Sequence, residues 1–466
     1  MPRVIPLTLA QIAGITGAVL DRVPDTGALV TGRVVIDSRE AGPGGLFAAL
    51  AGERADGHDF AAAAVAAGAV AVLASRPVGV PALIVPDAAA ALAPLARAVV
   101  DRLPRLTIAG ITGSSGKTTT KDLTAHLAER LGPTVAPPGS FNNELGHPLT
   151  VLRADEGTRY LILELGARGR GHVARLCAIA PPRLGAVLNV GRAHVGGYFA
   201  DRAEVAQAKG ELVEALPADG VAVLNADDPE VLTMGSRTAA RLLSFGRTGA
   251  ADVRATGVQL DAEGRPSFTL NTPGGSAPVR MNLRGEHNVS NALAAAALAT
   301  ALGMPPADVA AALSAAVARS KWRMDVTLRA DGVRVINDAY NANPDSMRAA
   351  LTALASMAAG GRAFAVLGHM AELGGNSPAW HEEVGAFAAR AGVTALVVVG
   401  DEATPMLAGA KSEPGWTGEL VAVPDGAAAV AALADRIRPG DTVLVKASRA
   451  AALWDVAAAL AAEATA

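Results

Sequence analysis

Short runs of aliphatic residues alternate along this chain with alanine-rich stretches of helical periodicity. Most of the runs are continuously apolar, which is typical of parallel strands buried on both faces. The stretches between them are long enough for crossover helices, so the pattern predicts an α/β fold built on parallel sheets. The clearest strands are expected at residues 106–111, 160–165, 184–190, 220–225, 363–368, 395–400 and 442–447.

Residues 251–285 follow a different pattern, because apolar and polar positions alternate there and the turn sequences DAEGRP and NTPGG interrupt them. This favours a short antiparallel patch. Two seams, RLPRL at 102–106 and RSKWRMD at 319–325, divide a chain of 466 residues, which is long enough for about three domains. We expect three α/β domains without repeats, at residues 1–104, 105–319 and 320–466.

Composition limits which binding partners and which cellular compartment we expect. The 41 basic and 44 acidic residues leave a net charge of −3 without a dense basic run, so we expect no nucleic-acid partner. Cys177 is the only cysteine, which excludes an intrachain disulfide and a zinc site built from cysteines. Gly, Pro or charge interrupts every apolar run before the ~20 residues of a membrane span. We expect a cytoplasmic protein, monomeric and without membrane insertion.

The stretch AGITGSSGKTTT at residues 109–120 follows a predicted strand and opens a predicted helix. That arrangement collects backbone N–H groups and a helix N-terminus around one point, where an anion is stabilised. Lys117 would reach the outer phosphates of a nucleotide, and the Thr118 hydroxyl would ligate Mg²⁺. Five residues, however, separate Gly110 from Gly116, where the usual phosphate loop has four.

Two other stretches suggest different nucleotides. GRGHVA after the strand at 160–165 has the form of a dinucleotide fingerprint, but no acid for a ribose follows about 20 residues later. NADD at 225–228 is superficially like a guanine-binding motif, with Ala226 in the place of its lysine. Both remain alternatives, and ATP is favoured over NAD and GTP.

Candidate metal ligands follow the next two strands. Glu164 ends one of them and His194 follows the other, and ligands bind at this carboxyl edge of open α/β sheets. A carboxylate and an imidazole near a γ-phosphate are suited to a metal ion. Lys209, considered on its own, is an exposed helix lysine.

Together these motifs resemble the Mur ligases, the ATP-dependent amide ligases that build the peptidoglycan precursor, and the resemblance covers the whole chain. The family loop, Gly-(Ser/Thr)-x-Gly-Lys-(Ser/Thr), fits the sequence from Gly113, which accounts for the residue count. The resemblance implies a small N-terminal α/β domain, a central phosphate-loop domain with a parallel sheet, and a C-terminal Rossmann-like domain. It implies nucleotide contacts from Gly113, Ser114, Ser115, Gly116, Lys117, Thr118, Thr119, Asn288, Asn291, Arg323 and Asp338.

The resemblance also implies the chemistry of the site. Arg323 would contact the γ-phosphate, although SKWRM departs from the family's Pro-Gly-Arg and leaves Arg319 as the other candidate. Two Mg²⁺ ions are implied, together with a carbamate on Lys209. The catalytic residues would be Lys117, Lys209, His194 and Arg323, and the metal ligands Thr118, Glu164, His194 and Lys209. Substrate contacts would come from Ser38, Arg39, His58, Asn142, Asn143, Tyr340, Asn341, Asn343, Ser346, Lys446, Ser448 and Arg449.

Three segments resemble those of the family members that add D-alanyl-D-alanine to UDP-N-acetylmuramoyl-tripeptide: Glu-Leu-Gly-Ala, Tyr-Asn-Ala-Asn-Pro and Met-Ala-Glu-Leu-Gly. His369 stands where many of these members have an acid, so it receives no charged role. The implied reaction passes through an acyl phosphate. Another amide ligase of the superfamily, tripeptide-forming or of the folylpolyglutamate or cyanophycin type, remains an alternative, as does a noncatalytic phosphate-loop module. The third residue of the tripeptide, diaminopimelate or lysine, stays open.

Overall fold

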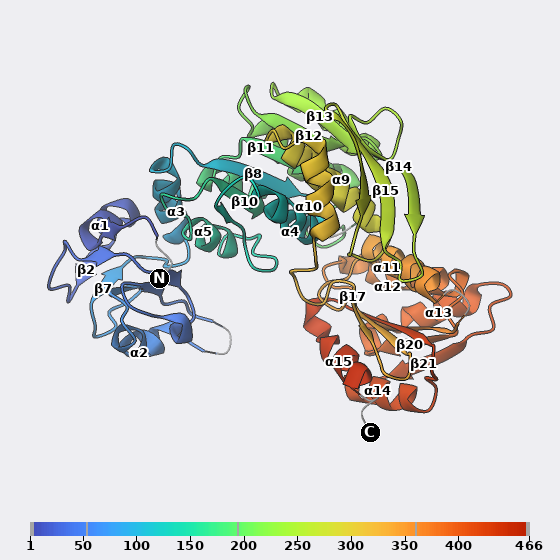
Figure 1. Cartoon of the computed structure of the whole chain (residues 1–466). Coiled ribbons are helices and arrows are strands. Elements are labelled where there is room, and N and C mark those ends of the chain that lie inside the picture. Colours follow the sequence, from blue (N-terminus) through green and yellow to red (C-terminus); the bar gives the residue numbers. More distant parts are fainter. Residues whose placement is uncertain (1–3, 53–54, 193–194, 359–360, 463–466) are drawn as a thin grey trace.

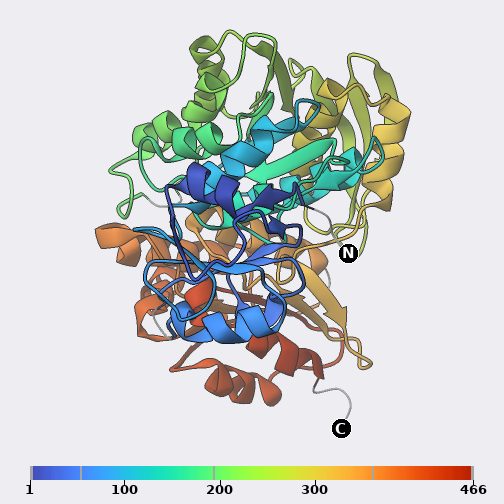
Figure 2. The same ribbon diagram turned by 90° about the vertical axis from the view of Figure 1, so that its left-hand side faces the viewer.

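The computed structural model describes residues 4–52, 55–192, 195–358 and 361–462. These residues form three large sheets and one two-stranded sheet, with helices on the faces of the large sheets. Figure 1 shows the N-terminal and C-terminal parts lying on either side of the central sheet, and Figure 2 shows the same arrangement from the N-terminal side. The mixed α/β class that the sequence predicts is confirmed.

The N-terminal part is a five-stranded sheet in the order β2-β7-β6-β5-β4, in which β2 is antiparallel and the other strands are parallel. The short strands β1 and β3 pair separately. Helix α3 packs on α5 of the central part, so one apolar core continues across this junction. The elements are β1 Leu7–Thr8, α1 Leu9–Thr16, β2 Val19–Asp21, β3 Leu29–Val30, β4 Val34–Val35, β5 Leu46–Ala48, α2 Ala61–Ala66, β6 Ala71–Ala74, β7 Ala82–Ile84 and α3 Leu92–Asp101.

The central part is a nine-stranded sheet in the order β16-β15-β14-β13-β12-β11-β8-β10-β9. Its strands are parallel from β9 to β14, and β15 and β16 add the antiparallel patch that the alternating sequence predicts. The elements are β8 Thr107–Thr112, α4 Lys117–Ala128, β9 Thr134–Val135, α5 Gly146–Val151, β10 Tyr160–Glu164, α6 His172–Ile179, β11 Leu184–Val187, α7 Arg202–Glu214, β12 Val221–Asn225, α8 Pro229–Thr233, β13 Arg241–Gly246, β14 Val253–Leu260, β15 Pro266–Thr272, β16 Gly275–Arg280, α9 His287–Ala301 and α10 Pro306–Ala315.

The C-terminal part is a six-stranded sheet in the order β17-β18-β22-β19-β20-β21, with β17 as the only antiparallel strand among the described residues. Helices α11, α12 and α13 cover one face, and α14 and α15 cover the other. The elements are β17 Asp325–Leu328, β18 Arg334–Asn337, α11 Pro344–Met357, β19 Ala363–Gly368, α12 Ser377–Arg390, β20 Ala395–Val399, α13 Pro405–Ser412, β21 Glu419–Val423, α14 Gly426–Ala434, β22 Thr442–Lys446 and α15 Trp454–Ala462.

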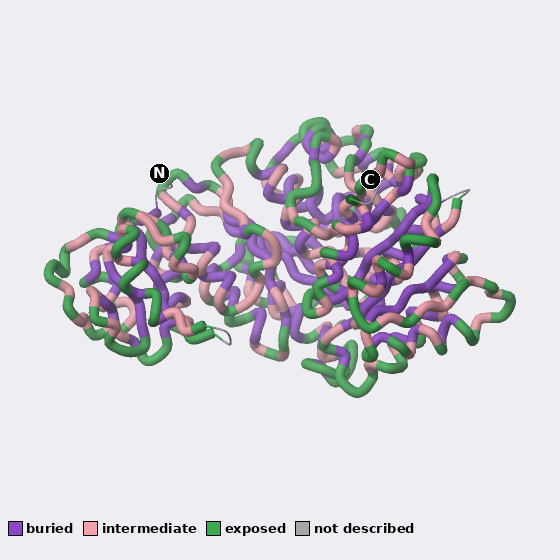
Figure 3. The backbone as a smooth tube through the Cα atoms, turned by 90° about the horizontal axis from the view of Figure 1, so that it is seen from below, coloured by how far each residue is buried: buried purple, intermediate pink, exposed green. Residues whose placement is uncertain are grey.

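Burial explains why the strand runs carry so few polar residues. Helices α4, α9 and α10 cover one face of the central sheet, and α6 and α7 cover part of the other, so the inner strands are shielded on both sides. The tube in Figure 3 is accordingly purple along these inner strands and mostly green at the periphery. Alanine-rich helices allow this close packing because their small side chains bring helix and sheet together. None of the helices in the described residues has the length and apolar character needed to cross a bilayer.

A short linker joins α10 to β17 and is held at both ends. Ser320 Oγ donates to Asp122 Oδ2 of α4 at 2.6 Å, which ties one end to the central part. The Trp322 ring stacks on Trp454 of α15, with ring centroids 4.5 Å apart, which ties the other end to the C-terminal part. Trp322 and Met324 have φ values of +61° and +54°, a conformation that bulky side chains rarely adopt. The backbone therefore has an unusual conformation where the linker enters the C-terminal part.

Candidate active site

The phosphate loop lies at the carboxyl end of β8, the edge at which open α/β sheets bind ligands. The Ser114 and Ser115 N–H groups both donate to Asn189 Oδ1, each at 2.9 Å, so a side chain from the segment after β11 shapes the loop. Gly116 caps α4 with a left-handed backbone, φ +80°, and a Cβ at this position would collide with Asn291 Oδ1. The loop conformation therefore requires glycine at position 116.

Two lysines lie beside the loop, Lys117 half-buried and Lys209 buried. The Lys117 ammonium donates to the Gly113 carbonyl at 2.7 Å, and burial lowers the pKa of Lys117. Lys209 on α7 is 2% exposed, and burial together with the charge of Lys117 holds the pKa of Lys209 well below its usual value. The interpretation of Lys209 as an exposed helix lysine is therefore wrong, because α7 presents this residue to the cleft rather than to solvent. The lowered pKa of Lys209 favours its neutral amine, which is the nucleophilic form.

Glu164 is the point where three segments of the central part meet. This carboxylate is 1% exposed at the end of β10. It accepts hydrogen bonds from Thr118 Oγ at 2.8 Å, from Ser140 Oγ at 2.8 Å and from Asn142 Nδ2 at 2.7 Å. Hydroxyl and carboxylate oxygens are the ligands that Mg²⁺ prefers. His194, the imidazole that the sequence pairs with Glu164, lies outside the described residues.

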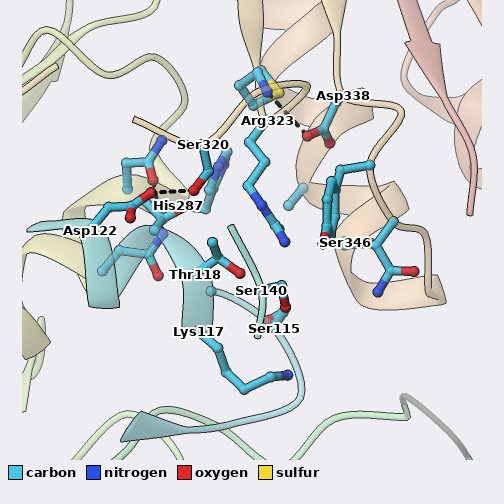
Figure 4. Close-up of a pocket in the computed structure, with 18 of the residues that line it drawn as sticks. Ser115, Lys117, Thr118, Asp122, Ser140, His287, Ser320, Arg323, Asp338 and Ser346 are labelled. Carbon is cyan, nitrogen blue, oxygen red and sulfur yellow. Dashed lines mark hydrogen bonds between the residues drawn. The ribbon is translucent and has the colours of Figure 1, made fainter. Parts of the chain in front are cut away.

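A cavity of about 820 Å³ opens over the loop, between the central and C-terminal parts. Figure 4 shows side chains from both parts pointing into it. Gly113 and Ser448 directly precede lining residues, whereas none of the N-terminal candidates reaches this cavity. The sequence-predicted residues that line it are Ser114, Ser115, Gly116, Lys117, Thr118, Thr119, Asn142, Asn143, Glu164, Lys209, Asn288, Asn291, Arg323, Asp338, Tyr340, Asn341, Asn343, Ser346, Lys446 and Arg449.

The structure separates the two arginine candidates. Arg319 forms an ion pair at 2.6 Å with Glu129, the residue that caps the C-terminal end of α4. Arg323 lies 4.3 Å from the centre of the Tyr340 ring, and Figure 4 shows its guanidinium reaching toward Thr118. Both arginines line the cavity, but Arg319 binds the C-terminal end of the phosphate-loop helix, whereas Arg323 points toward its N-terminal end.

Two asparagines fix the start of α9 beside the loop. Asn291 Nδ2 donates to Asn288 Oδ1 at 2.8 Å, and Asn288 Nδ2 donates to the Arg284 carbonyl at 2.7 Å. Asn291 Oδ1 also accepts a hydrogen bond from Thr120 Oγ of α4 at 3.4 Å. Both amides are buried, so they hold this wall of the cavity against the loop helix.

On the C-terminal side, a buried lysine organises the wall of the cavity. Lys446 Nζ donates to Asp338 Oδ2 at 2.6 Å and to the Asn341 carbonyl at 2.8 Å. Asp338 Oδ1 accepts from the Met324 N–H at 3.1 Å, which connects the wall to the linker. The Arg449 guanidinium lies 5.9 Å from the centre of the Tyr340 ring.

Asn343 and Ser346 have a local structural role that the sequence did not reveal. Asn343 is the N-cap of α11: its Oδ1 accepts from the Ser346 N–H at 2.9 Å, and its own N–H donates to Ser346 Oγ at 3.0 Å. This capping box satisfies N–H groups that a helix start would otherwise leave unpaired. The two side chains therefore set the direction of the first turn of α11 at the cavity wall.

The N-terminal candidates form a separate surface. Ser38 and Arg39 lie in a short 3₁₀ turn, and the Arg39 side chain is exposed. His58 is buried: its Nδ1 lies 2.6 Å from Asp56 Oδ1, and its Nε2 accepts from the Ser75 N–H at 3.1 Å. These contacts hold the imidazole in one orientation beside the turn that follows β6.

At both alternative nucleotide motifs, carboxylates of the protein already bind backbone N–H groups. Glu211 of α7 accepts from the Gly171 N–H at 2.6 Å and from the Ala174 N–H at 3.0 Å, so a carboxylate already fills the helix start that a dinucleotide pyrophosphate would need. Asp228 caps α8, and Asp227 accepts from the two N–H groups that follow β13. These interactions argue against the NAD and GTP alternatives.

Comparison with known proteins agrees with this geometry. Family models match residues 32–108 (Mur ligase family, catalytic domain), 111–299 (Mur ligase middle domain) and 322–449 (Mur ligase, glutamate ligase domain). A UDP-N-acetylmuramoyl-tripeptide–D-alanyl-D-alanine ligase of Mycobacterium tuberculosis is 53% identical, over 99% of both chains. The chain belongs to the Mur ligase family. The ligase of the same name from Escherichia coli is 38% identical to this Mur ligase, over 98% of both chains.

Solved structures give the same result at the level of the fold. MurF from Acinetobacter baumannii superposes on this Mur ligase with a TM-score of 0.88 at 33% identity, covering 99% of this chain and 100% of that one. A MurF ligase from Thermotoga maritima, solved in complex with ADP, superposes with a TM-score of 0.80 at 30% identity, covering 93% and 98%. The resemblance that the sequence motifs suggest is confirmed as a MurF-type Mur ligase with the three-part architecture.

Two residues that shape the site of this Mur ligase stand in motifs that the sequence shows, but the sequence did not identify them as site residues. Ser140 donates to Glu164, and Asn189 holds the phosphate loop. Ser140 stands two residues before Asn142, and Asn189 opens the segment that leads to the predicted histidine. Their positions in the motifs were the available signal, but only the fold shows what these side chains contact.

We predict that Gly116→Ala abolishes nucleotide binding to this Mur ligase, because the new Cβ meets a left-handed backbone and the Asn291 amide. Gly171→Ala is a matched control: Gly171 also caps a helix with φ of +78°, but a Cβ there meets only the flexible Arg175 guanidinium, at 3.9 Å. Backbone strain of about 1 kcal/mol is common to both variants. Calorimetric titration with ADP should show binding to Gly171→Ala and none to Gly116→Ala; equal affinities would contradict the clash.

Proposed function

We propose that this Mur ligase uses ATP to join D-alanyl-D-alanine to UDP-N-acetylmuramoyl-tripeptide, giving the UDP-linked pentapeptide of peptidoglycan synthesis. One observation carries the proposal: the phosphate loop, the Glu164 carboxylate and Arg323 share one cavity with the start of α11. A ligase that transfers a phosphoryl group and then admits an amine needs both sides of such a cavity. The relative that is 53% identical over 99% of the chain has this activity in its name.

The nucleotide site fits ATP. The loop offers its N–H groups and the start of α4 to the phosphates, with Lys117 beside them. Asn288 and Asn291 line the neighbouring wall for the base, and Asp338 would contact the ribose. The relative from Thermotoga maritima was solved with ADP, which supports a nucleotide in this position.

The oxygen donors around Glu164 fit Mg²⁺. Thr118 Oγ lies 2.8 Å from this carboxylate, and hydroxyl plus carboxylate is a normal partial ligand set when phosphates supply the rest. Within the described residues no group of three or more His, Cys, Asp or Glu side chains could hold a metal by itself. In this proposal the phosphates would supply further ligands. Mg²⁺ neutralises the charge that develops on the transferred phosphoryl group. His194 and a modified Lys209 are the further ligands that we propose for two ions.

In the first step, the terminal carboxylate of the tripeptide attacks the γ-phosphorus of ATP. The new O–P bond forms as the bond to the ADP oxygen breaks, and the product is an acyl phosphate. Lys117 and Arg323 approach the transferred group from opposite walls of the cavity. Their fixed positive charges stabilise the transition state, because they need no reorganisation at the moment of transfer. Asn142 and Asn143 would hold the tripeptide beside Glu164.

In the second step, the amine of D-alanyl-D-alanine attacks the acyl carbon, and phosphate leaves. Tyr340 and Asn341 line the C-terminal wall where this amine would enter. Asn343 and Ser346 act there through the first turn of α11, whose direction their capping box sets. Lys446, Ser448 and Arg449 provide cationic and hydroxyl donors suited to the carboxylate of the dipeptide.

Each part of the chain has a role in this scheme. Residues 1–104 would bind the uridine nucleotide through Ser38, Arg39 and His58, residues 105–319 would bind ATP, and residues 320–466 would bind the dipeptide. The three N-terminal side chains do not line the cavity in this arrangement, so the domains close when substrates bind. Closure also keeps water from the acyl phosphate. We also propose that the protein is a cytoplasmic monomer without nucleic-acid partners.

Lys209 has the properties that carbamylation requires. CO₂ reacts with a neutral amine, and burial beside Lys117 keeps the amine of Lys209 neutral at a lower pH than an exposed lysine allows. The carbamate would replace a second cation with an anionic oxygen ligand next to the phosphates. It would thereby offset the repulsion between Lys209 and Lys117.

The proposed activity is tested by ADP release from purified protein with Mg·ATP and UDP-N-acetylmuramoyl-tripeptide, with and without D-alanyl-D-alanine. We expect turnover only when both substrates are present, and the preferred tripeptide identifies its third residue as diaminopimelate or lysine. ADP binding without turnover on either tripeptide would overturn the proposal. That outcome would favour the activity of another amide ligase of the superfamily, or a noncatalytic nucleotide-binding role.

We predict that Arg323→Ala lowers kcat about 100-fold, as the loss of one transition-state donor does. Arg319→Ala is the matched control from the same linker. Its ion pair with Glu129 is exposed and stabilises the fold by less than about 1 kcal/mol. Steady-state kinetics at saturating ATP should therefore leave kcat of Arg319→Ala within about twofold of the parent. A larger loss of kcat in Arg319→Ala than in Arg323→Ala would assign the γ-phosphate contact to Arg319.

The carbamate predicts a dependence on CO₂ and on pH. Activity should fall about tenfold in CO₂-depleted buffer and return when bicarbonate is added. It should also fall as the pH drops through the lowered pKa of Lys209, because protonation removes the nucleophilic amine. Lys121→Arg is the control, since Lys121 is equally buried but donates to the Pro137 carbonyl. A parent enzyme that is indifferent to CO₂ would contradict the carbamate.

A further inference from the structure

The segment after β11, residues 189–192, is in contact with the phosphate loop along one side. Asn189 Oδ1 accepts from the N–H groups of Ser114 and Ser115, and Asn189 Nδ2 donates to the Ser115 carbonyl at 3.2 Å. The Gly191 N–H donates to Ser114 Oγ at 2.8 Å. These hydrogen bonds join the segment to two consecutive loop residues, so movement of the loop moves the segment as well.

The other side of the segment is held by the C-terminal part. The Arg192 N–H donates to Asp345 Oδ2 at 2.9 Å, in the first turn of α11. The Arg192 guanidinium donates to Glu383 of α12 at 3.0 Å and lies 4.6 Å from the centre of the Trp380 ring. Arg192 thus belongs to the central part in sequence, but its partners belong to the C-terminal part.

Gly191 leaves no free space between the two sides. A Cβ at this position would lie 3.2 Å from Ser114 Cβ and would collide with the Asp345 carboxylate. The phosphate loop, Gly191 and Asp345 are therefore stacked in direct contact. In such a contact a displacement on one side is transmitted rather than absorbed, because packed interfaces are not freely compressible.

We propose that Asp345 is a positioning residue that couples nucleotide binding at the phosphate loop to binding of D-alanyl-D-alanine at the C-terminal wall. This inference rests on the proposed ligase function. Nucleotide bound on the loop fixes Ser114, and through Gly191 and Arg192 it holds Asp345. Asp345 stands in the same helical turn as the capping box of Asn343 and Ser346, so the amine-side wall is fixed at the same time. Coupling of this kind is reciprocal between the two ligands.

The experiment is calorimetric titration of D-alanyl-D-alanine into protein that is saturated with UDP-N-acetylmuramoyl-tripeptide, with and without Mg²⁺ and a non-hydrolysable ATP analogue. The ratio of the two Kd values is the coupling factor. For the parent protein we expect the nucleotide to tighten dipeptide binding about fivefold or more. In Asp345→Ala the factor should fall to within about twofold of one. In Asp345→Asn, which keeps an oxygen acceptor, most of the coupling should remain.

Asp425→Ala is the control for loss of an acidic residue at a helix start in the same part of the chain. Asp425 caps α14 by accepting from the Ala428 N–H at 2.9 Å, far in sequence from the stacked contact, and should keep the parent factor. If Asp345→Ala weakens dipeptide binding equally with and without nucleotide, Asp345 is only structural and the inference is wrong. A parent factor of one also overturns it. Absence of parental turnover would instead refute the ligase proposal, so the two failures are distinguishable.

Discussion

The buried carboxylate of Glu164 is the interaction on which the site depends. A carboxylate that is 1% exposed must be compensated by hydrogen-bond donors, and here the donors come from the phosphate-loop helix and from the loop at 140–142. Because Thr118, Ser140 and Asn142 all converge on it, the nucleotide loop and the loop proposed to hold the tripeptide have a fixed separation. We propose that the same oxygens bind Mg²⁺ once a nucleotide supplies its phosphates.

The fold and the phosphate loop could be predicted from the sequence because their signals are local. Continuous apolar runs and a Gly-Lys-Thr turn after a strand leave few alternatives. The environment of Lys209 could not be predicted in this way, since its burial arises from the packing of α7 against the loop. Nor could the capping box of Asn343 and Ser346 be separated from a substrate contact. The interaction of Arg192 with Asp345 joins residues 153 positions apart, and only the tertiary structure reveals it.

The cavity combines a cationic wall with closely packed supports. Lys117, Lys209 and Arg323 face it, and burial disfavours the charged forms of both lysines until anions are present. Bound phosphates would favour the charged form of Lys117. A carbamate on Lys209 would replace one cation with an anion. The C-terminal wall is joined to the same loop through Gly191 and Asp345. The residues after β11 therefore connect the phosphate loop, where the anions would bind, to the C-terminal part.

We propose that Glu164 becomes a metal ligand when the nucleotide binds. The affinity for ADP should be measured with and without Mg²⁺, in the parent protein and in Glu164→Gln, whose amide keeps the shape of the carboxylate. We expect Mg²⁺ to strengthen ADP binding to the parent and Glu164→Gln to lose about tenfold or more of this enhancement. The same enhancement by Mg²⁺ in both proteins would contradict it.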